Sequence, residues 1–102
     1  MNEAEFQRQV TDLADIFGWS WIHLRPAQTQ HGWRTPVSGP MGKGWPDLFM
    51  ARGYRSIAAE LKSEKGKATP EQNAVLELLQ ATGVETFVWR SGDFDRIVEI
   101  LE

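Results

Sequence analysis

The sequence PDLFMARGYRSIAAELK, residues 46–62, decides the fold that we expect for this chain. It holds two apolar runs, 47–51 and 56–62, separated by the glycine-containing stretch 52–55. Short apolar runs on either side of a turn signal are typical of two strands joined as a β-hairpin. We therefore expect a β-hairpin here.

Three charged residues gather at one end of this hairpin. Asp47 opens the first strand, and Glu60 and Lys62 close the second. Because side chains alternate along a strand, Glu60 and Lys62 share one face, and the other face takes only apolar residues. Those apolar residues are Ile57, Ala59 and Leu61. Two carboxylates and an amine can therefore converge.

Converging carboxylates suit a hard divalent cation. Asp47 and Glu60 would supply anionic oxygens to Mg²⁺ or Mn²⁺, with the backbone carbonyl of Leu61 as a further ligand. A metal lowers the pKa of bound water and shields a phosphate, and a nearby lysine orients the nucleophile or neutralises charge in the transition state. The set fits phosphodiester hydrolysis, with Lys62 beside the attacking water. A bare Glu-x-Lys is more often a pair of ordinary charges at a strand end, so the spacing alone does not decide.

Hydrophobic periodicity predicts the elements around the hairpin. Apolar residues at helical spacing indicate a helix over 3–17. Thr69, Pro70 and Gln72 match a capping box that opens a second helix, which Gly83 ends. The other expected elements are a strand over 19–24, a strand over 84–89 and a last helix capped by Ser91 or Asp93. The resulting order is αβββαβα.

A long loop is expected over residues 25–45, which contain three prolines and four glycines. Loops of about 20 residues are unusual in small domains and tend to be functional or disordered. We take this one to face a substrate. Its Trp33 and Trp45 could stack on an unpaired base or pack in a dimer interface, although ordinary loop packing is the more common explanation for such residues.

Charge is distributed unevenly along the chain. The formal net charge is -3, but residues 25–67 hold eight of the 11 basic residues and only three of the 14 acidic ones. A basic middle between acidic ends indicates a surface that faces a polyanion. Scattered solubilising charge is the plainer alternative.

Length and composition fit one globular domain over residues 1–102, with 41% hydrophobic residues. The absence of cysteine excludes a disulfide, a thiolate zinc site and a cysteine nucleophile. The start is acidic, and no apolar run approaches the roughly 18 residues of a membrane span. We therefore expect a cytoplasmic protein that does not enter the membrane.

The hairpin motif resembles the active-site signature of the PD-(D/E)XK nuclease superfamily. In detail, GWPDL at 44–48, AELK at 59–62, GKATPEQ at 66–72 and LQATGV at 79–84 resemble a stand-alone VRR-Nuc domain. The resemblance runs from about Glu3 to the C-terminus. It implies an α/β, restriction-endonuclease-like PD-(D/E)XK core with a central mixed sheet flanked by helices.

Members of that family are structure-specific, metal-dependent endonucleases, and the fused members include the Fanconi-associated nuclease. The short stand-alone forms of bacteria and their viruses resemble archaeal Holliday junction resolvases and act as homodimers. This chain has the stand-alone length. The resemblance therefore implies an endodeoxyribonuclease dependent on Mg²⁺ or Mn²⁺, acting as a homodimer on branched DNA, in particular four-way junctions.

Carried over residue by residue, the resemblance implies that Asp47 and Glu60 bind the metal and that Lys62 is the catalytic lysine. Gln72 matches the family's glutamine early in the following helix, where it would hold the lysine or a water. The capping box is an alternative role for Gln72, and both can hold at once. For the glutamate of the first helix, Glu3 and Glu5 compete.

Helical spacing favours Glu3, because it lies on the stripe with Phe6, Gln7 and Val10. Its alternative role is a dipole-favourable acid at a fraying helix start. Among the basic residues, Lys43 could contact a phosphate near the cut. Candidates for tracking the DNA backbone are Arg25, His31, Arg34, Lys65 and Lys67. His31 has no second histidine or cysteine at ligand spacing and is not a convincing zinc ligand.

Three alternatives to a junction resolvase stay open at this point. A nuclease of this family could prefer flaps or forks. A non-catalytic module of the same fold could bind DNA or protein through the loop and the basic residues, although it would not require converging carboxylates. A sequence-specific restriction endonuclease shares the core, but 102 residues leave little room for a base-reading element.

Overall fold

A computed structural model describes residues 1–24, 27–29, 32–34 and 37–102 of the chain. Its main elements confirm the order αβββαβα. They are α1 (Glu3–Ile16), β1 (Ser20–His23), β4 (Leu48–Arg52), β5 (Arg55–Leu61), α2 (Pro70–Ala81), β6 (Glu85–Trp89) and α3 (Phe94–Leu101).

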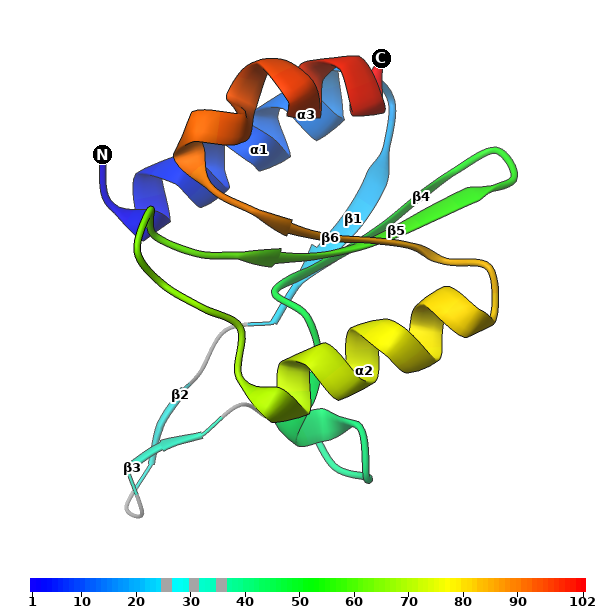
Figure 1. Ribbon diagram of the computed structural model, residues 1–102. Helices are drawn as coiled ribbons and strands as arrows, with labels where there is room; N and C mark the ends of the chain where they lie inside the picture. The colour runs from blue at the N-terminus through cyan, green and yellow to red at the C-terminus, as the bar shows by residue number, and fades with distance from the viewer. Residues whose placement is uncertain (25–26, 30–31, 35–36) are drawn as a thin grey trace.

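The four longer strands form one mixed sheet in the order β1-β4-β5-β6. β4 pairs antiparallel with β1 and with β5, so the predicted hairpin is confirmed, while β6 runs parallel to β5. Parallel neighbours need a crossover connection, and α2 supplies it. Figure 1 shows α1 and α3 together on one face of the sheet and α2 on the other.

The central strand β5 is covered on both faces, and its last five residues are buried. Ile57, Ala59 and Leu61 pack into the main core under α1 and α3, as the alternation predicted. Their partners from the other elements include Phe6, Val10, Leu48, Met50, Trp89, Ile97 and Leu101. Glu60 therefore points to the opposite face, which α2 covers.

The expectation of an unstructured loop over 25–45 is wrong in part. Within it, β2 (Ala27–Thr29) and β3 (Gly32–Arg34) pair antiparallel, and a 3-10 helix, η1, spans Gly42–Gly44. Strands of three residues are too short to show a period of two in the sequence. Figure 1 shows β2 and β3 standing away from the main sheet.

Of the two helix caps that the sequence predicts, one forms as expected and the other differs in its hydrogen bonding. Asn2 caps α1, and the predicted capping box of Thr69 and Gln72 opens α2. Before α3, a 3-10 helix, η2, spans Ser91–Asp93. Asp93 takes the N-cap position, but its carboxylate accepts the Arg90 N–H instead of capping α3. No helix in the described part of the chain is long and apolar enough to cross a membrane.

Candidate active site

The β4–β5 register brings Asp47 and Glu60 together. Leu48 pairs with Ala59, so the residues one step further out, Asp47 and Glu60, lie opposite one another. Asp47 is held in place because its Oδ2 accepts the backbone N–H of Leu61 at 2.9 Å. The two carboxylates that the sequence singled out are thus neighbours at one end of the hairpin.

Glu60 is an acid in an interior position, with only 1% of its surface exposed. Its Oε1 accepts a hydrogen bond from Gln72 Nε2 at 3.0 Å and lies 3.8 Å from the ammonium of Lys62. Its Oε2 is buried and has no hydrogen-bond partner among the described residues. One oxygen is satisfied by the protein, and the other is not.

The electrostatics of Glu60 reflect this setting. Burial, together with the negative charge of the adjoining Asp47 carboxylate, raises its pKa to about 8. Lys62 acts in the opposite direction but does not cancel it. Two adjacent carboxylates, one with a buried unpaired oxygen, form a donor set that suits a hard divalent cation.

The protein supplies few ligands of its own. Within the described ranges, no group of three or more His, Cys, Asp or Glu side chains is arranged to hold a metal. Asp47 and Glu60 would therefore need backbone, water or substrate oxygens to complete the coordination of Mg²⁺ or Mn²⁺. The Leu61 carbonyl stays a prediction, and Leu61 itself lines a pocket with Asp47.

Asp47 lies between two pockets. The first, of about 180 Å³, is lined by Glu3, Ala4, Gln7, His23, Asp47 and Leu61. The second, of about 190 Å³, is lined by Leu24, Gly42, Lys43, Trp45, Pro46, Asp47 and Gln72. Glu3 thus lies in a pocket with Asp47, whereas Glu5 exchanges hydrogen bonds with Asn2 at the helix start. The geometry favours Glu3 over Glu5 as the helical glutamate of the site.

Gln72 combines the two roles that the sequence left open. Its Oε1 accepts the Thr69 N–H at 2.8 Å, which completes the capping box. Because the amide oxygen is used in this way, the Nε2 group faces Glu60 and donates to it. The start of α2 therefore fixes the orientation of a carboxylate on β5.

Not all of the basic residues proposed to contact DNA lie near Asp47 and Glu60. Lys43 lines the second pocket, but its ammonium lies 3.6 Å from Glu71 on the exposed start of α2. Lys65 and Lys67 are exposed in the loop after Lys62. Arg34 belongs to β3, and the predictions for Arg25 and His31 fall outside the described residues. Of the two loop tryptophans, Trp45 packs near Phe49, with ring centroids 5.8 Å apart.

Sequence reasoning missed two residues that line the first pocket. Gln7 lies one turn after Glu3 on α1, and His23 ends β1 opposite Leu48. The stripe shared by Glu3 and Gln7 was the available signal for Gln7. For His23 no signal existed, because its place depends on β1 pairing with β4, and 24 residues separate His23 from its partner Leu48.

Close backbone contact between η1 and α2 holds the segment that leads to Asp47. A Cβ on Gly44 would lie 2.2 Å from the Glu71 carbonyl oxygen and 2.9 Å from Val75 Cγ2. We expect Gly44→Ala to lower the free energy of unfolding by about 2–4 kcal/mol, since backbone must move. Denaturant titration measures this. Gly92→Ala is the control, because the nearest atom to its new Cβ is a side-chain oxygen of Glu64 at 3.3 Å rather than backbone at 2.2 Å; equal losses in both would contradict the argument.

Comparison with known proteins supports the fold. No family model and no curated protein matches the chain. A solved structure described as a "VRR_NUC domain protein" superposes with a TM-score of 0.57 and 23% sequence identity, covering 98% of this chain and 84% of that one. The chain is therefore an α/β protein with a mixed sheet flanked by helices. More particularly, it has the fold of that VRR_NUC domain protein.

Proposed function

We propose that this protein is a Mg²⁺- or Mn²⁺-dependent endonuclease that hydrolyses phosphodiester bonds in branched DNA. The observation that carries the proposal is the buried, unpaired Oε2 of Glu60 beside Asp47, with the Lys62 ammonium on the other oxygen. A purely structural site would pair that oxygen, since an unsatisfied buried acceptor costs about 1–3 kcal/mol. The solved structure with the same fold is named a VRR_NUC domain protein, and that name supports the nuclease part of the proposal.

Each residue of the site has a distinct task in this proposal. A bound divalent cation would shield the phosphate charge and lower the pKa of an attacking water. Asp47 and Glu60 hold the cation, and the Leu61 N–H keeps Asp47 aligned. Lys62, whose side chain is 19% exposed, keeps its ammonium at the edge of the site, where it orients the water or neutralises charge on the phosphate. Glu3 borders the space next to Asp47.

Gln72 is expected to tune metal affinity through Glu60. Gln72→Ala removes the neutral hydrogen-bond donor to Glu60 Oε1 that is found among the described residues, so we expect Mn²⁺ affinity to fall by about 10- to 100-fold. Thr69→Ala is the matched control, because it weakens the same cap but leaves the Gln72–Glu60 hydrogen bond. Calorimetric Mn²⁺ titration distinguishes them. Equal losses of affinity would assign Gln72 to the helix cap alone.

We propose that the protein acts as a homodimer on four-way junctions. Symmetric cleavage of such a junction needs two active sites, and a two-fold axis supplies them. β1 lies at an edge of the sheet, and its Trp21 and Ile22 are 38% and 54% exposed. An apolar edge of this kind favours a second chain as a neighbour. A sedimentation mass of one chain at micromolar concentration, with and without junction DNA, would contradict the dimer.

Cleavage of labelled DNA tests the activity and the substrate together. A four-way junction is compared with flap, fork, linear duplex and single-stranded DNA in Mg²⁺, Mn²⁺ or EDTA. Paired, metal-dependent nicks at the branch point are the expected result. Cleavage confined to flaps or forks would keep the nuclease and remove the resolvase. Cleavage that persists in EDTA would contradict the metal dependence, and no cleavage with any metal would leave a binding module of the same fold.

A further inference from the structure

The loop between β5 and α2 carries the densest run of lysines in the chain. Residues 62–69, which we call the basic loop, hold Lys62, Lys65 and Lys67 together with a single acid, Glu64. Lys65 and Lys67 are exposed. An acid among lysines weakens attraction for a polyanion, so an acid at this position suggests a separate structural role. The surroundings of Glu64 show such a role.

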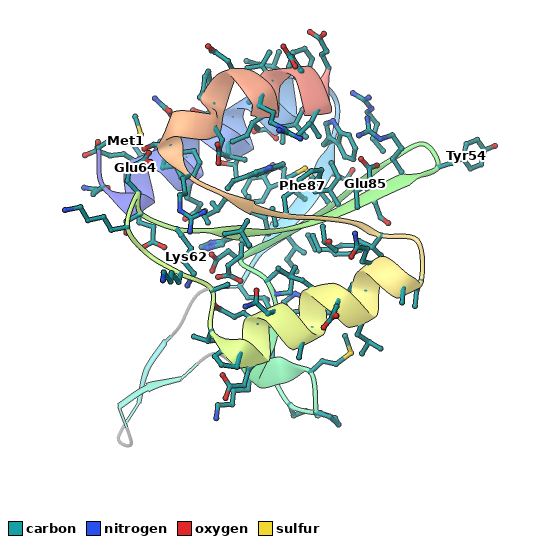
Figure 2. The ribbon with its side chains drawn as sticks, in the orientation of Figure 1. Met1, Tyr54, Lys62, Glu64, Glu85 and Phe87 are labelled. Atoms are coloured by element: carbon teal, nitrogen blue, oxygen red, sulfur yellow. The ribbon has the colours of Figure 1, made fainter. Side chains whose placement is uncertain are left out.

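Glu64 is bound to the connection between β6 and α3. Its Oε1 accepts the Ser91 hydroxyl at 2.5 Å and the Gly92 backbone N–H at 2.7 Å. These bonds hold the pKa of the Glu64 carboxyl below its usual value. In Figure 2, Glu64 lies on the side of the α1–α3 layer, and Lys62 lies on the side of α2. The acid is therefore turned away from the face that bears Lys62.

Two more contacts fix the basic loop to the same connection. Arg90 Nη2 donates to the Gly66 carbonyl at 2.5 Å, and Lys62 N donates to the Trp89 carbonyl at 3.0 Å. Within the loop, Gly66 N donates to the carbonyl and the hydroxyl of Ser63. The loop is thus tied at three points along residues 62–66 to residues 89–92. Lys65 and Lys67 project from a segment whose backbone is held.

We infer that Glu64 is a positioning residue, which Ser91 and Gly92 hold so that Lys65 and Lys67 bind the DNA backbone along the basic loop, which begins at Lys62 of the Asp47–Glu60 site. Long exposed lysines lose rotamer freedom when they bind phosphate, and a fixed backbone lowers that cost. The inference rests on the proposed function, because it requires a DNA substrate. It adds a residue whose own charge opposes DNA binding but whose hydrogen bonds support it.

The negative charge of Glu64 should weaken DNA binding, and its hydrogen bonds should strengthen it. Variants that remove one or both can therefore separate the two effects. Glu64→Ala removes the acid and the tie, whereas Glu64→Gln removes the acid but keeps an oxygen that can accept from Ser91 and Gly92. We expect Glu64→Ala to weaken binding of a fluorescent four-way junction in EDTA by about five- to tenfold. The slope of log Kd against log salt concentration should also decrease, by an amount that corresponds to about one lost phosphate contact. Glu64→Gln should bind at least as tightly as the wild type.

A second pair of variants involves no change of charge. Ser91→Ala removes the hydroxyl donor to Glu64, so it should weaken binding of the junction by about two- to threefold. Ser91→Thr keeps a hydroxyl at this position and should bind as tightly as the wild type. Glu77→Ala on the exposed face of α2 is the control for loss of an acid alone. Thermal melting of each variant is used to check that it is folded at the assay temperature.

Variants of Lys65 and Lys67 test whether Glu64 acts through these two side chains. In a Lys65→Gln, Lys67→Gln background, adding Glu64→Ala should cause no further loss of affinity, because the groups that Glu64 positions are gone. If Glu64→Ala and Glu64→Gln tighten binding equally, the acid acts through charge alone and the inference is overturned. If the wild type binds no DNA at any salt concentration, the proposed function fails and this inference with it. Wild-type binding with no change in slope for Glu64→Ala overturns the inference alone.

Discussion

Lys62→Ala is expected to abolish DNA cleavage while the protein still binds its divalent cation. Lys62 contacts Glu60 at 3.8 Å but is not itself a metal ligand, so its loss removes transition-state stabilisation rather than the metal. Asp47→Ala and Glu60→Ala should lose both cleavage and metal binding, because they remove the anionic oxygens of the site. We expect all three to reduce the rate of cleavage by about a thousandfold or more.

Single-turnover cleavage of the preferred DNA and calorimetric Mn²⁺ titration, made on the same samples, separate these cases. Lys65→Ala is the matched control, because it removes the same charge from the exposed basic loop. It should weaken DNA binding but leave the rate at saturating enzyme close to that of the wild type. Full activity in Asp47→Ala, Glu60→Ala or Lys62→Ala would contradict the assignment of the site.

The core of the fold could be predicted because its signals are local. Two apolar runs flank a turn, so the β4–β5 hairpin follows from residues 47–62 alone. The capping box at Thr69 likewise involves residues three apart, and it formed as predicted. The hairpin β2–β3 has no such signal, because three-residue strands give too few positions for a pattern.

The site could be predicted only in part, because its chemistry depends on contacts between distant elements. Alternation placed Glu60 on the face opposite the core residues, but it gave no reason to expect a buried acid. Glu60 is buried because the crossover helix α2 covers that face of β5. The pocket shared by Glu3 and His23 with Asp47 similarly requires α1 and β1 to lie beside β4, and no short motif encodes that.

The buried acid also makes the stability of the metal-free protein depend on pH. The pKa of Glu60 is about 8 in the folded protein, against an ordinary value of 4.5, so the folded state keeps a proton that the unfolded state has lost. The contribution of Glu60 to the free energy of unfolding should therefore be largest below about pH 5 and fall as pH rises through about 5 to 8, by up to about 1.4 kcal/mol per pH unit. The dependence should level off once the folded state is also ionised.

Glu60→Gln tests this origin of the dependence. The glutamine side chain has nearly the same shape as glutamate but does not ionise. The metal-free variant should therefore be about 2–4 kcal/mol more stable than the wild type above about pH 8. Denaturant titrations in EDTA across this range measure the difference, with Glu77→Gln on the exposed face of α2 as the control. A wild-type stability that stays level or rises from about pH 6 to 8 would contradict a buried, protonated Glu60.

The same proton makes metal binding depend on pH in the opposite direction. A cation binds the ionised carboxylate, so below pH 8 its binding must release the proton of Glu60. Affinity for Mn²⁺ should rise about tenfold per pH unit up to about pH 8 and then level off. Calorimetry in buffers of different ionisation enthalpy counts the released protons, and about one should appear near neutral pH. If no proton is released, Glu60 is already ionised in the metal-free protein. The cation would then raise the free energy of unfolding, but there would be no pH-dependent loss of stability for it to reverse.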